Sequence, residues 1–148
     1  MNKQLKILAV LSVLLLPYVN DMPNAAAANF DGSAPLLCAP ITANECDLGA
    51  PCQPLSIEDA GLPQFVVIDL NEKTIKPTPE TGKTNITKIA SLTSIDGKFI
   101  LQGAEDGRKD EKDGLGWTIS IDQETGKLVM AAAGEQVAFV IYGACTIR

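Results

Sequence analysis

Apolar and polar residues alternate along much of the chain after Pro63, with the period of two that is typical of β-strands. The clearest run is residues 117–122, which places Trp117, Ile119 and Ile121 on one face and predicts that they point inward. The final run, residues 137–147, is apolar on both faces, so we expect a central or covered strand there. Other predicted strands cover residues 65–68, 73–76, 84–95, 98–103 and 127–133, and the 84–95 strand is expected to carry a bulge.

Turn signals separate these runs and predict how the strands connect. Asp96-Gly97 is typical of a two-residue hairpin turn, which needs residues that tolerate positive φ. Asp69, Asp96 and Asp122 each close a strand just before a turn, where a carboxylate can accept hydrogen bonds from the backbone amides ahead of it. Because most connections are short, neighbouring strands should pair in sequence. We therefore expect an all-β domain over residues 65–148, an antiparallel meander of about six to eight strands in a closed or half-closed barrel, with a β-sandwich as the alternative.

Residues 29–64 lack this alternation and hold three of the four cysteines and five prolines. They are predicted to form an irregular, disulfide-tied N-terminal arm. One helical turn is expected at residues 56–60, where Ser56 can cap the turn and Gly61 and Pro63 end it.

Residues 1–28 have the three-part pattern of a secretory signal peptide. Lys3 and Lys6 form a positive start, residues 7–19 are almost wholly apolar, and four alanines end the segment. As a helix the apolar part would reach only about 20 Å, short of the ~30 Å core of a bilayer. The sequence thus predicts export to the periplasm or the extracellular medium, with no stable membrane span after cleavage.

Composition narrows the classes of function. The 148 residues include 12 Lys and Arg against 18 Asp and Glu, giving a net charge of −6, and there is no histidine. An acidic chain without a basic block is poorly suited to binding nucleic acid, whose affinity comes from Lys and Arg on phosphates. The absence of histidine excludes Ser-His-Asp and Cys-His catalysis and His-ligated metal sites. No cofactor is predicted.

Four cysteines in an exported chain are typical of two disulfide bonds, for which the sequence allows three pairings. Cys46 and Cys52 lie in a polar, turn-rich stretch where a short loop can close. Cys38 lies in an apolar setting, and Cys145 shares a strand face with Phe139 if alternation holds. We favour Cys46–Cys52 and Cys38–Cys145.

The segments 116–122, 125–126 and 138–145, with the cysteine arm and the strand entry Pro63-Gln64-Phe65, are similar to those of small exported bacterial proteins of unassigned function. The resemblance spans nearly all of the chain after residue 28. Its motifs are turns, core strands and cysteines, so it implies a fold and export but no activity, ligand or catalytic residue.

Candidate sites each have a simpler structural interpretation. The charged stretch from Glu105 to Asp113 offers carboxylates to a cation, but cations are interleaved with them and the spacing is not that of a calcium loop, so a solvated loop is expected. Asp69, Asp96 and Asp122 are the first carboxylates to consider for hydrolase chemistry, although turn bonding is their ordinary role. Trp117, Ile119 and Phe139 are either core residues or ligand-facing ones. No catalytic, cofactor-binding or metal-binding residue is assigned.

The leading hypothesis is an exported, non-enzymatic β domain that binds a small apolar ligand or a partner protein. The alternatives are a small carboxylate-based hydrolase and a purely structural surface-interaction protein. An apolar cavity inside the barrel would favour ligand binding, a filled core would favour interaction surfaces, and a cleft with two facing acids would favour the hydrolase.

Overall fold

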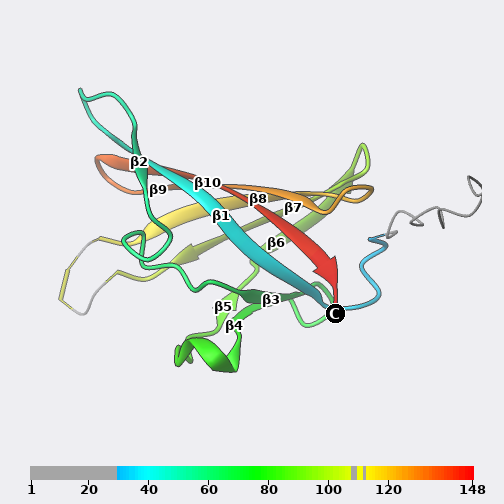
Figure 1. The fold of residues 1–148 in the computed structure, drawn as a ribbon. Coiled ribbons are helices and arrows are strands. Elements are labelled where there is room, and N and C mark those ends of the chain that lie inside the picture. The colour runs from blue at the N-terminus through cyan, green and yellow to red at the C-terminus, as the bar shows by residue number, and fades with distance from the viewer. Residues whose placement is uncertain (1–29, 108–109, 112) are drawn as a thin grey trace, which may run out of the picture.

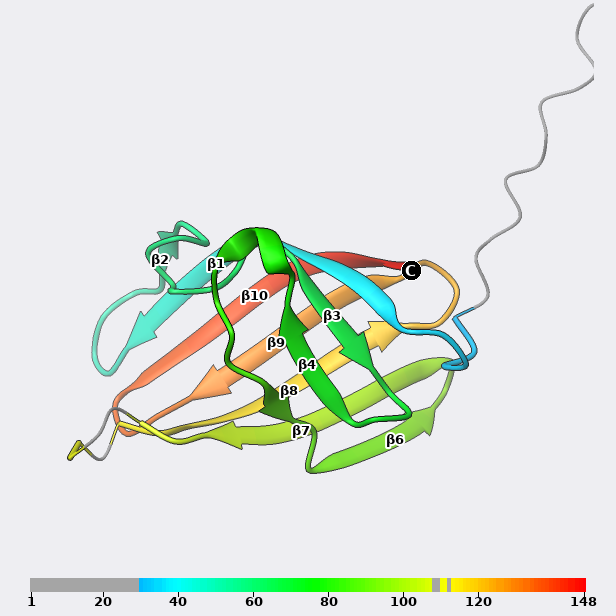
Figure 2. The same cartoon turned by 90° about the horizontal axis from the view of Figure 1, so that it is seen from below.

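The computed structural model describes residues 30–107, 110–111 and 113–148. The predicted signal peptide, residues 1–28, lies outside this part of the chain. Within it, ten strands form one antiparallel sheet that curls into a half-barrel, as Figures 1 and 2 show. The strands are β1 (Leu36–Asp47), β2 (Gln53–Leu55), β3 (Val66–Asp69), β4 (Thr74–Pro77), β5 (Thr87–Lys88), β6 (Ser91–Ile95), β7 (Lys98–Glu105), β8 (Leu115–Asp122), β9 (Lys127–Ala133) and β10 (Val137–Ile147), with a 3-10 helix at Pro79–Thr81. An all-β half-barrel is one of the forms that the sequence predicts.

The second half of the chain is the expected meander. Strands β6 to β10 pair in sequence, each antiparallel to the next. Asp96 and Gly97 have φ values of 47° and 69°, which confirms the two-residue turn between β6 and β7. Asp122 accepts bonds from the turn that it precedes, with its Oδ1 atom 2.8 Å from the Thr125 nitrogen.

The expected irregular arm is wrong for residues 36–47, which form β1, the longest strand. β1 pairs with β10 along its whole length, and its other edge pairs with β3 near Leu36 and with β2 near Ala43. The register shifts between Pro40 and Thr42, so Ile41 is an extra residue there. Such a bulge resets the alternation of faces, and this hides the strand from a period-two reading of the sequence.

The predicted long strand over residues 84–95 is also wrong, because the chain forms β5 and β6 with a bend between them. Ile89, at the bend, is 4% exposed, and its N–H donates to the Lys73 carbonyl at 2.9 Å. The next N–H, that of Ala90, donates to the Gln102 carbonyl at 2.8 Å. Since β5 pairs with β4 and β6 with β7, the bend carries the chain from one end of the sheet to the other.

The hollow of the half-barrel is filled by apolar side chains. Trp117, Ile119 and Ile121 are all buried, at 5%, 4% and 0% exposure, as the alternation predicts. They join one core cluster with residues from both ends of the sheet, among them Leu36, Ile68, Ile89, Phe99, Leu101 and Leu128, and Phe139 packs against it.

Gly103 leaves the space that the Trp117 ring occupies in this core. The two residues face each other across β7 and β8, and a Cβ on Gly103 would overlap the indole ring. Directly opposed side chains on paired strands are close neighbours, so a Trp ring can lie across the facing strand only where the opposite residue has no side chain.

We therefore expect Gly103→Ala to lower the free energy of unfolding by about 1–3 kcal/mol through overpacking, measured by urea denaturation. Gly116→Ala is the matched control, because a Cβ at that position on β8 meets nothing within 4 Å. Equal losses in the two variants would contradict this account of Gly103.

The disulfides are the two pairs that the sequence favours. Cys38 and Cys145 face each other across β1 and β10 in the core, 107 residues apart in sequence. Cys46 and Cys52 close the β1–β2 hairpin, six residues apart. Two such bonds are typical of proteins that fold in an oxidising compartment.

The lengths of the loops that the two disulfide bonds close predict unequal contributions to the free energy of unfolding. Replacing Cys38 and Cys145 together by Ala should lower the free energy of unfolding by about 4–5 kcal/mol, since that bond closes a long loop of the unfolded chain. The Cys46→Ala, Cys52→Ala double variant, as the comparison, should lose about 2 kcal/mol. Urea denaturation of the oxidised proteins measures both, and a larger loss for the short-loop pair would contradict the expected order.

Candidate functional site

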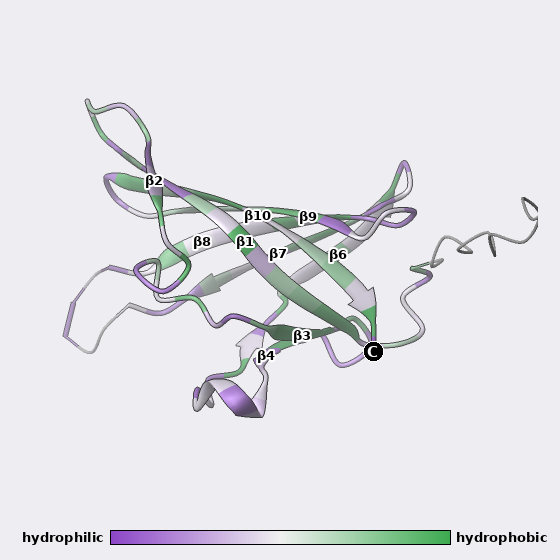
Figure 3. Cartoon of the chain, viewed as in Figure 1, coloured by the Kyte–Doolittle hydropathy of each residue, from purple (hydrophilic) through white to green (hydrophobic). Residues whose placement is uncertain are grey.

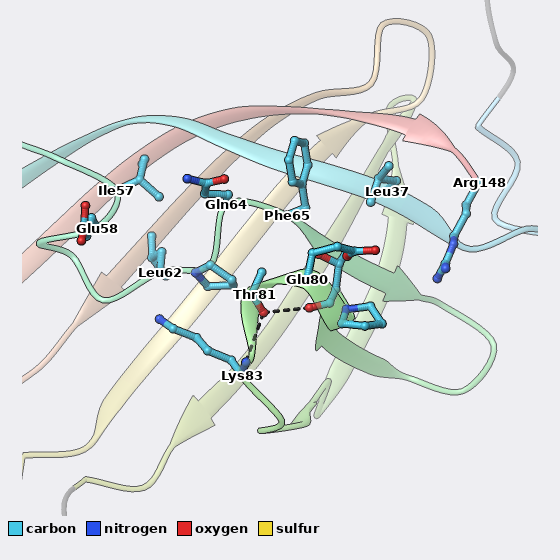
Figure 4. A pocket seen from close by; sticks show the side chains of 13 residues that line it. Leu37, Ile57, Glu58, Leu62, Gln64, Phe65, Glu80, Thr81, Lys83 and Arg148 are labelled. Carbon is cyan, nitrogen blue, oxygen red and sulfur yellow. Dashed lines mark hydrogen bonds between the residues drawn. The ribbon is translucent and has the colours of Figure 1, made fainter.

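A groove of about 780 Å³ lies on the face of β1 that points away from the core. Leu37 lines it, whereas its neighbours Leu36 and Cys38 on the opposite face of the strand belong to the core cluster. The remaining lining residues come from the segments 57–65 and 78–83 and from the last residue: Ile57, Glu58, Leu62, Pro63, Gln64, Phe65, Thr78, Pro79, Glu80, Thr81, Lys83 and Arg148 (Figure 4).

A single helical turn builds one wall of the groove, at the place the sequence predicts. Ser56 Oγ accepts the Asp59 N–H at 3.0 Å and lies 2.5 Å from the Asp59 carboxylate, a capping arrangement. The Ala60 N–H donates to the Ser56 carbonyl at 2.9 Å. This turn presents Ile57 and Glu58 to the groove.

The 3-10 helix Pro79–Thr81 builds the facing wall. Pro79 fits the start of a helix, where its missing N–H costs nothing, and Gly82 ends it with a φ of 67°. Thr81 Oγ1 donates to the Thr78 carbonyl at 2.8 Å, a bond drawn in Figure 4. Lys83 Nζ donates to the Gly61 carbonyl and so links this wall to the helical turn.

Apolar surface and balanced charges characterise the groove. Phe65 is 45% exposed, and Leu37, Ile57 and Leu62 add further apolar side chains to the lining (Figure 4). In Figure 3 the hydrophobic colour covers β3 and the start of β1, while the 3-10 helix is hydrophilic. The charged lining residues are two acids, Glu58 and Glu80, and two bases, Lys83 and Arg148. The groove can therefore take an apolar group beside a neutral, polar rim.

The pKa of the Glu80 carboxyl lies below its ordinary value. Its own backbone amide and the Thr78 hydroxyl stabilise the charged form, and the Arg148 guanidinium adds a favourable charge. A general acid in a carboxylate pair needs a raised pKa instead. Glu80 is therefore poorly suited to the general-acid role of such a pair.

The sequence-predicted candidates all lie outside the groove. Trp117 and Ile119 are core residues, and Phe139 is partly buried against the core. Asp69 Oδ1 accepts the N–H groups of Asn71 and Glu72 at 3.0 and 2.9 Å, which is the turn role expected of it. Asp96 occupies the left-handed position of the β6–β7 turn.

The charged stretch from Glu105 to Asp113 includes Arg108, Lys109 and Lys112, which lie outside the described residues. In the part of the chain that the structure describes, no three His, Cys, Asp or Glu side chains gather as a cation site would require. The same residues contain no helix long and apolar enough to cross a membrane.

Comparison of the chain with protein-family models, with curated proteins and with solved structures gave no match.

Sequence reasoning missed the groove because its walls come from four distant segments. One signal was available: residues 65–68 are apolar at every position. Val66 and Ile68 face the core side, so Phe65 and Val67 fall on the opposite face. Apolar residues on that second face indicate that it is covered or binds something.

Asp122 gives a test of the turn role. Three donors, the N–H groups of Glu124 and Thr125 and the Thr125 hydroxyl, meet its Oδ1 atom, and they hold the pKa of Asp122 below its ordinary 3.8. A lowered folded-state pKa means that the ionised form stabilises the fold above the ordinary pKa, and that this contribution disappears as the pH falls through the lowered value. Asp122→Asn should therefore be less stable than the wild type at pH 7, and the difference should shrink below pH 3.8.

Urea denaturation over a pH series measures this difference. Glu124→Gln removes a negative charge from the same turn but leaves the three donors to Asp122 in place, so it is the control. A deficit of Asp122→Asn that stayed constant from pH 7 down to acid pH would show that the carboxylate charge is not what the turn uses.

Proposed function

We propose that this protein is an exported, non-enzymatic β domain that binds a small, largely apolar molecule in the groove beside β1. The observation that carries the proposal is the position of Phe65, an aromatic side chain left 45% exposed inside a concave, mostly apolar site. Concave sites of some 300–1,000 Å³ with apolar walls and a few polar groups are typical of small-molecule binding. The groove, at about 780 Å³, is in that range.

Because the interior of the half-barrel is filled, we favour the groove rather than the interior as the binding site. Trp117, Ile119, Phe99 and Leu101 are each 6% exposed or less and pack against one another. A ligand among them would have to displace buried apolar side chains, at a cost of about 1.5–3 kcal/mol for each one exposed. Binding in the groove requires no such displacement.

Export is part of the proposal. The two disulfides favour an oxidising compartment, and the pattern of residues 1–28 favours a cleaved signal peptide. We propose a periplasmic or extracellular location, where the groove would meet ligands outside the cytoplasm.

A hydrolase is the weaker alternative. The groove contains two carboxylates, Glu58 and Glu80, and the lowered pKa of Glu80 makes it a poor general acid, because that role needs a protonated carboxyl. The third possibility, a structural protein that uses the same apolar wall to hold a partner protein, differs from the proposal in the size of the occupant.

The neutral fluorescent probe N-phenyl-1-naphthylamine tests the proposal. We expect saturable binding to the wild type and about tenfold weaker binding to Phe65→Ser, because an apolar contact of about 1.4 kcal/mol is lost. Tyr142→Ser is the matched control, an aromatic residue 49% exposed on β10, away from the groove. Absence of saturable binding, or equal weakening in both variants, would refute the proposed site.

A further inference from the structure

Among the residues that the structure describes, β6 ends the sheet and pairs with one strand, β7. The two-residue turn Asp96-Gly97 makes Ile95 and Lys98 a hydrogen-bonded pair, so Thr93 and Ser91 also bond toward β7. The alternate residues, Leu92 and Ser94, then direct their N–H and C=O groups away from the sheet. β6 therefore presents two backbone donors and two acceptors along an open edge (Figure 2).

The other short strands are protected against edge pairing and β6 is not. β2 contains Pro54, which has no N–H to donate, and β5 is two residues long and carries Lys88. β6 has five residues, Ser-Leu-Thr-Ser-Ile, with neither a proline nor a charge. Ile95 on this strand is 56% exposed, and Thr93 is exposed as well. An uncharged edge of this kind is a template for another strand.

We propose that β6 pairs with β6 of a second copy of this chain, antiparallel about a two-fold axis at Thr93, so that two half-barrels share one continuous sheet. This register places Leu92 opposite Ser94 of the second copy, and the converse pair follows from the symmetry. All four outward N–H groups of the two edges then find a C=O partner, giving four hydrogen bonds. A register centred on Leu92 would leave Ser94 opposite Ala90, at the bend where the chain leaves β6 and where the Ala90 N–H already donates to Gln102.

Self-association is favoured over a charged peptide partner by the composition of the edge. Strand β6 offers no charge for a basic or acidic peptide to recognise. In the proposed register, Thr93 lies opposite Thr93 of the second copy at the axis, on the outer face of the sheet. The side chains of such a pair can hydrogen-bond. The net charge of −6 on each chain opposes association. The favourable free energy of pairing must therefore come from the contacts along the β6 edge.

Charge variants at the axis test the proposal. In the wild type, sedimentation equilibrium should show a concentration-dependent dimer. Thr93→Lys and Thr93→Glu should each raise the dissociation constant at least tenfold, because like charges then face each other across the axis. Mixing equal amounts of the two variants should restore the dimer, since Lys then faces Glu. Thr118→Lys, on the same outer face but on the central strand β8, is the control and should dimerise as the wild type does.

The two lysine variants separate edge pairing from a net-charge effect. Both make the chain less negative by one charge, which by itself would favour association, yet only Thr93→Lys should lose the dimer. Amide hydrogen exchange adds a second readout, in which the Leu92 and Ser94 amides should exchange more slowly as protein concentration rises. A wild type that stays monomeric to millimolar concentration, or variants whose mixture fails to associate while Thr118→Lys dimerises, would overturn the proposal.

Discussion

The pairing of β1 with β10 is the interaction on which the rest of the fold depends. Eleven residue pairs join these strands, and the Cys38–Cys145 bond lies within the ladder. β10 ends the meander of β6 to β10, and β1 carries β3, β4 and β5 on its other edge. Without this ladder the two groups of strands would be separate sheets, each with one apolar face exposed. Small sheets of that kind are marginal in water.

The same strand links the fold to the groove. On one face of β1, Leu36 and Cys38 seal the core, and on the other, Leu37 forms part of the groove wall. The C-terminal residue Arg148 reaches the groove because its N–H donates to the Pro35 carbonyl, just before β1 begins. The helical turn after Ser56 and the 3-10 helix after Thr78 form the other walls of the groove. A site assembled in this way is lost if the β1–β10 register slips by one residue, since every side chain would change face.

Local chemistry was readable from the sequence, whereas long-range pairing was not. The Asp96-Gly97 turn, the inward row of Trp117, Ile119 and Ile121, and the cap at Ser56 each depend on residues close in sequence, and each has the expected structure. The sequence did not reveal β1, because the bulge at Ile41 shifts the alternation and because its partners in β3 and β10 lie 28 to 111 residues away. The bend at Ile89 was not predicted, because in the sequence an apolar residue at a bend cannot be distinguished from one in a strand. The groove could not be predicted for the same reasons, because its walls depend on β1 and on pairings between segments distant in sequence. The one indication of it was the second apolar face of residues 65–68.

The interior of the half-barrel is packed with apolar side chains, and we propose that binding takes place outside it, beside β1. The chain has a single tryptophan, Trp117, whose indole N–H is buried in the core and so serves as an interior reporter. A two-dimensional NMR titration with N-phenyl-1-naphthylamine distinguishes binding beside β1 from binding in the interior. If the probe binds in the groove, the amide resonances of Leu37, Phe65 and Arg148 should shift while the Trp117 indole resonance stays in place. A titration that moves the indole resonance and leaves those three amides unchanged would contradict the proposal.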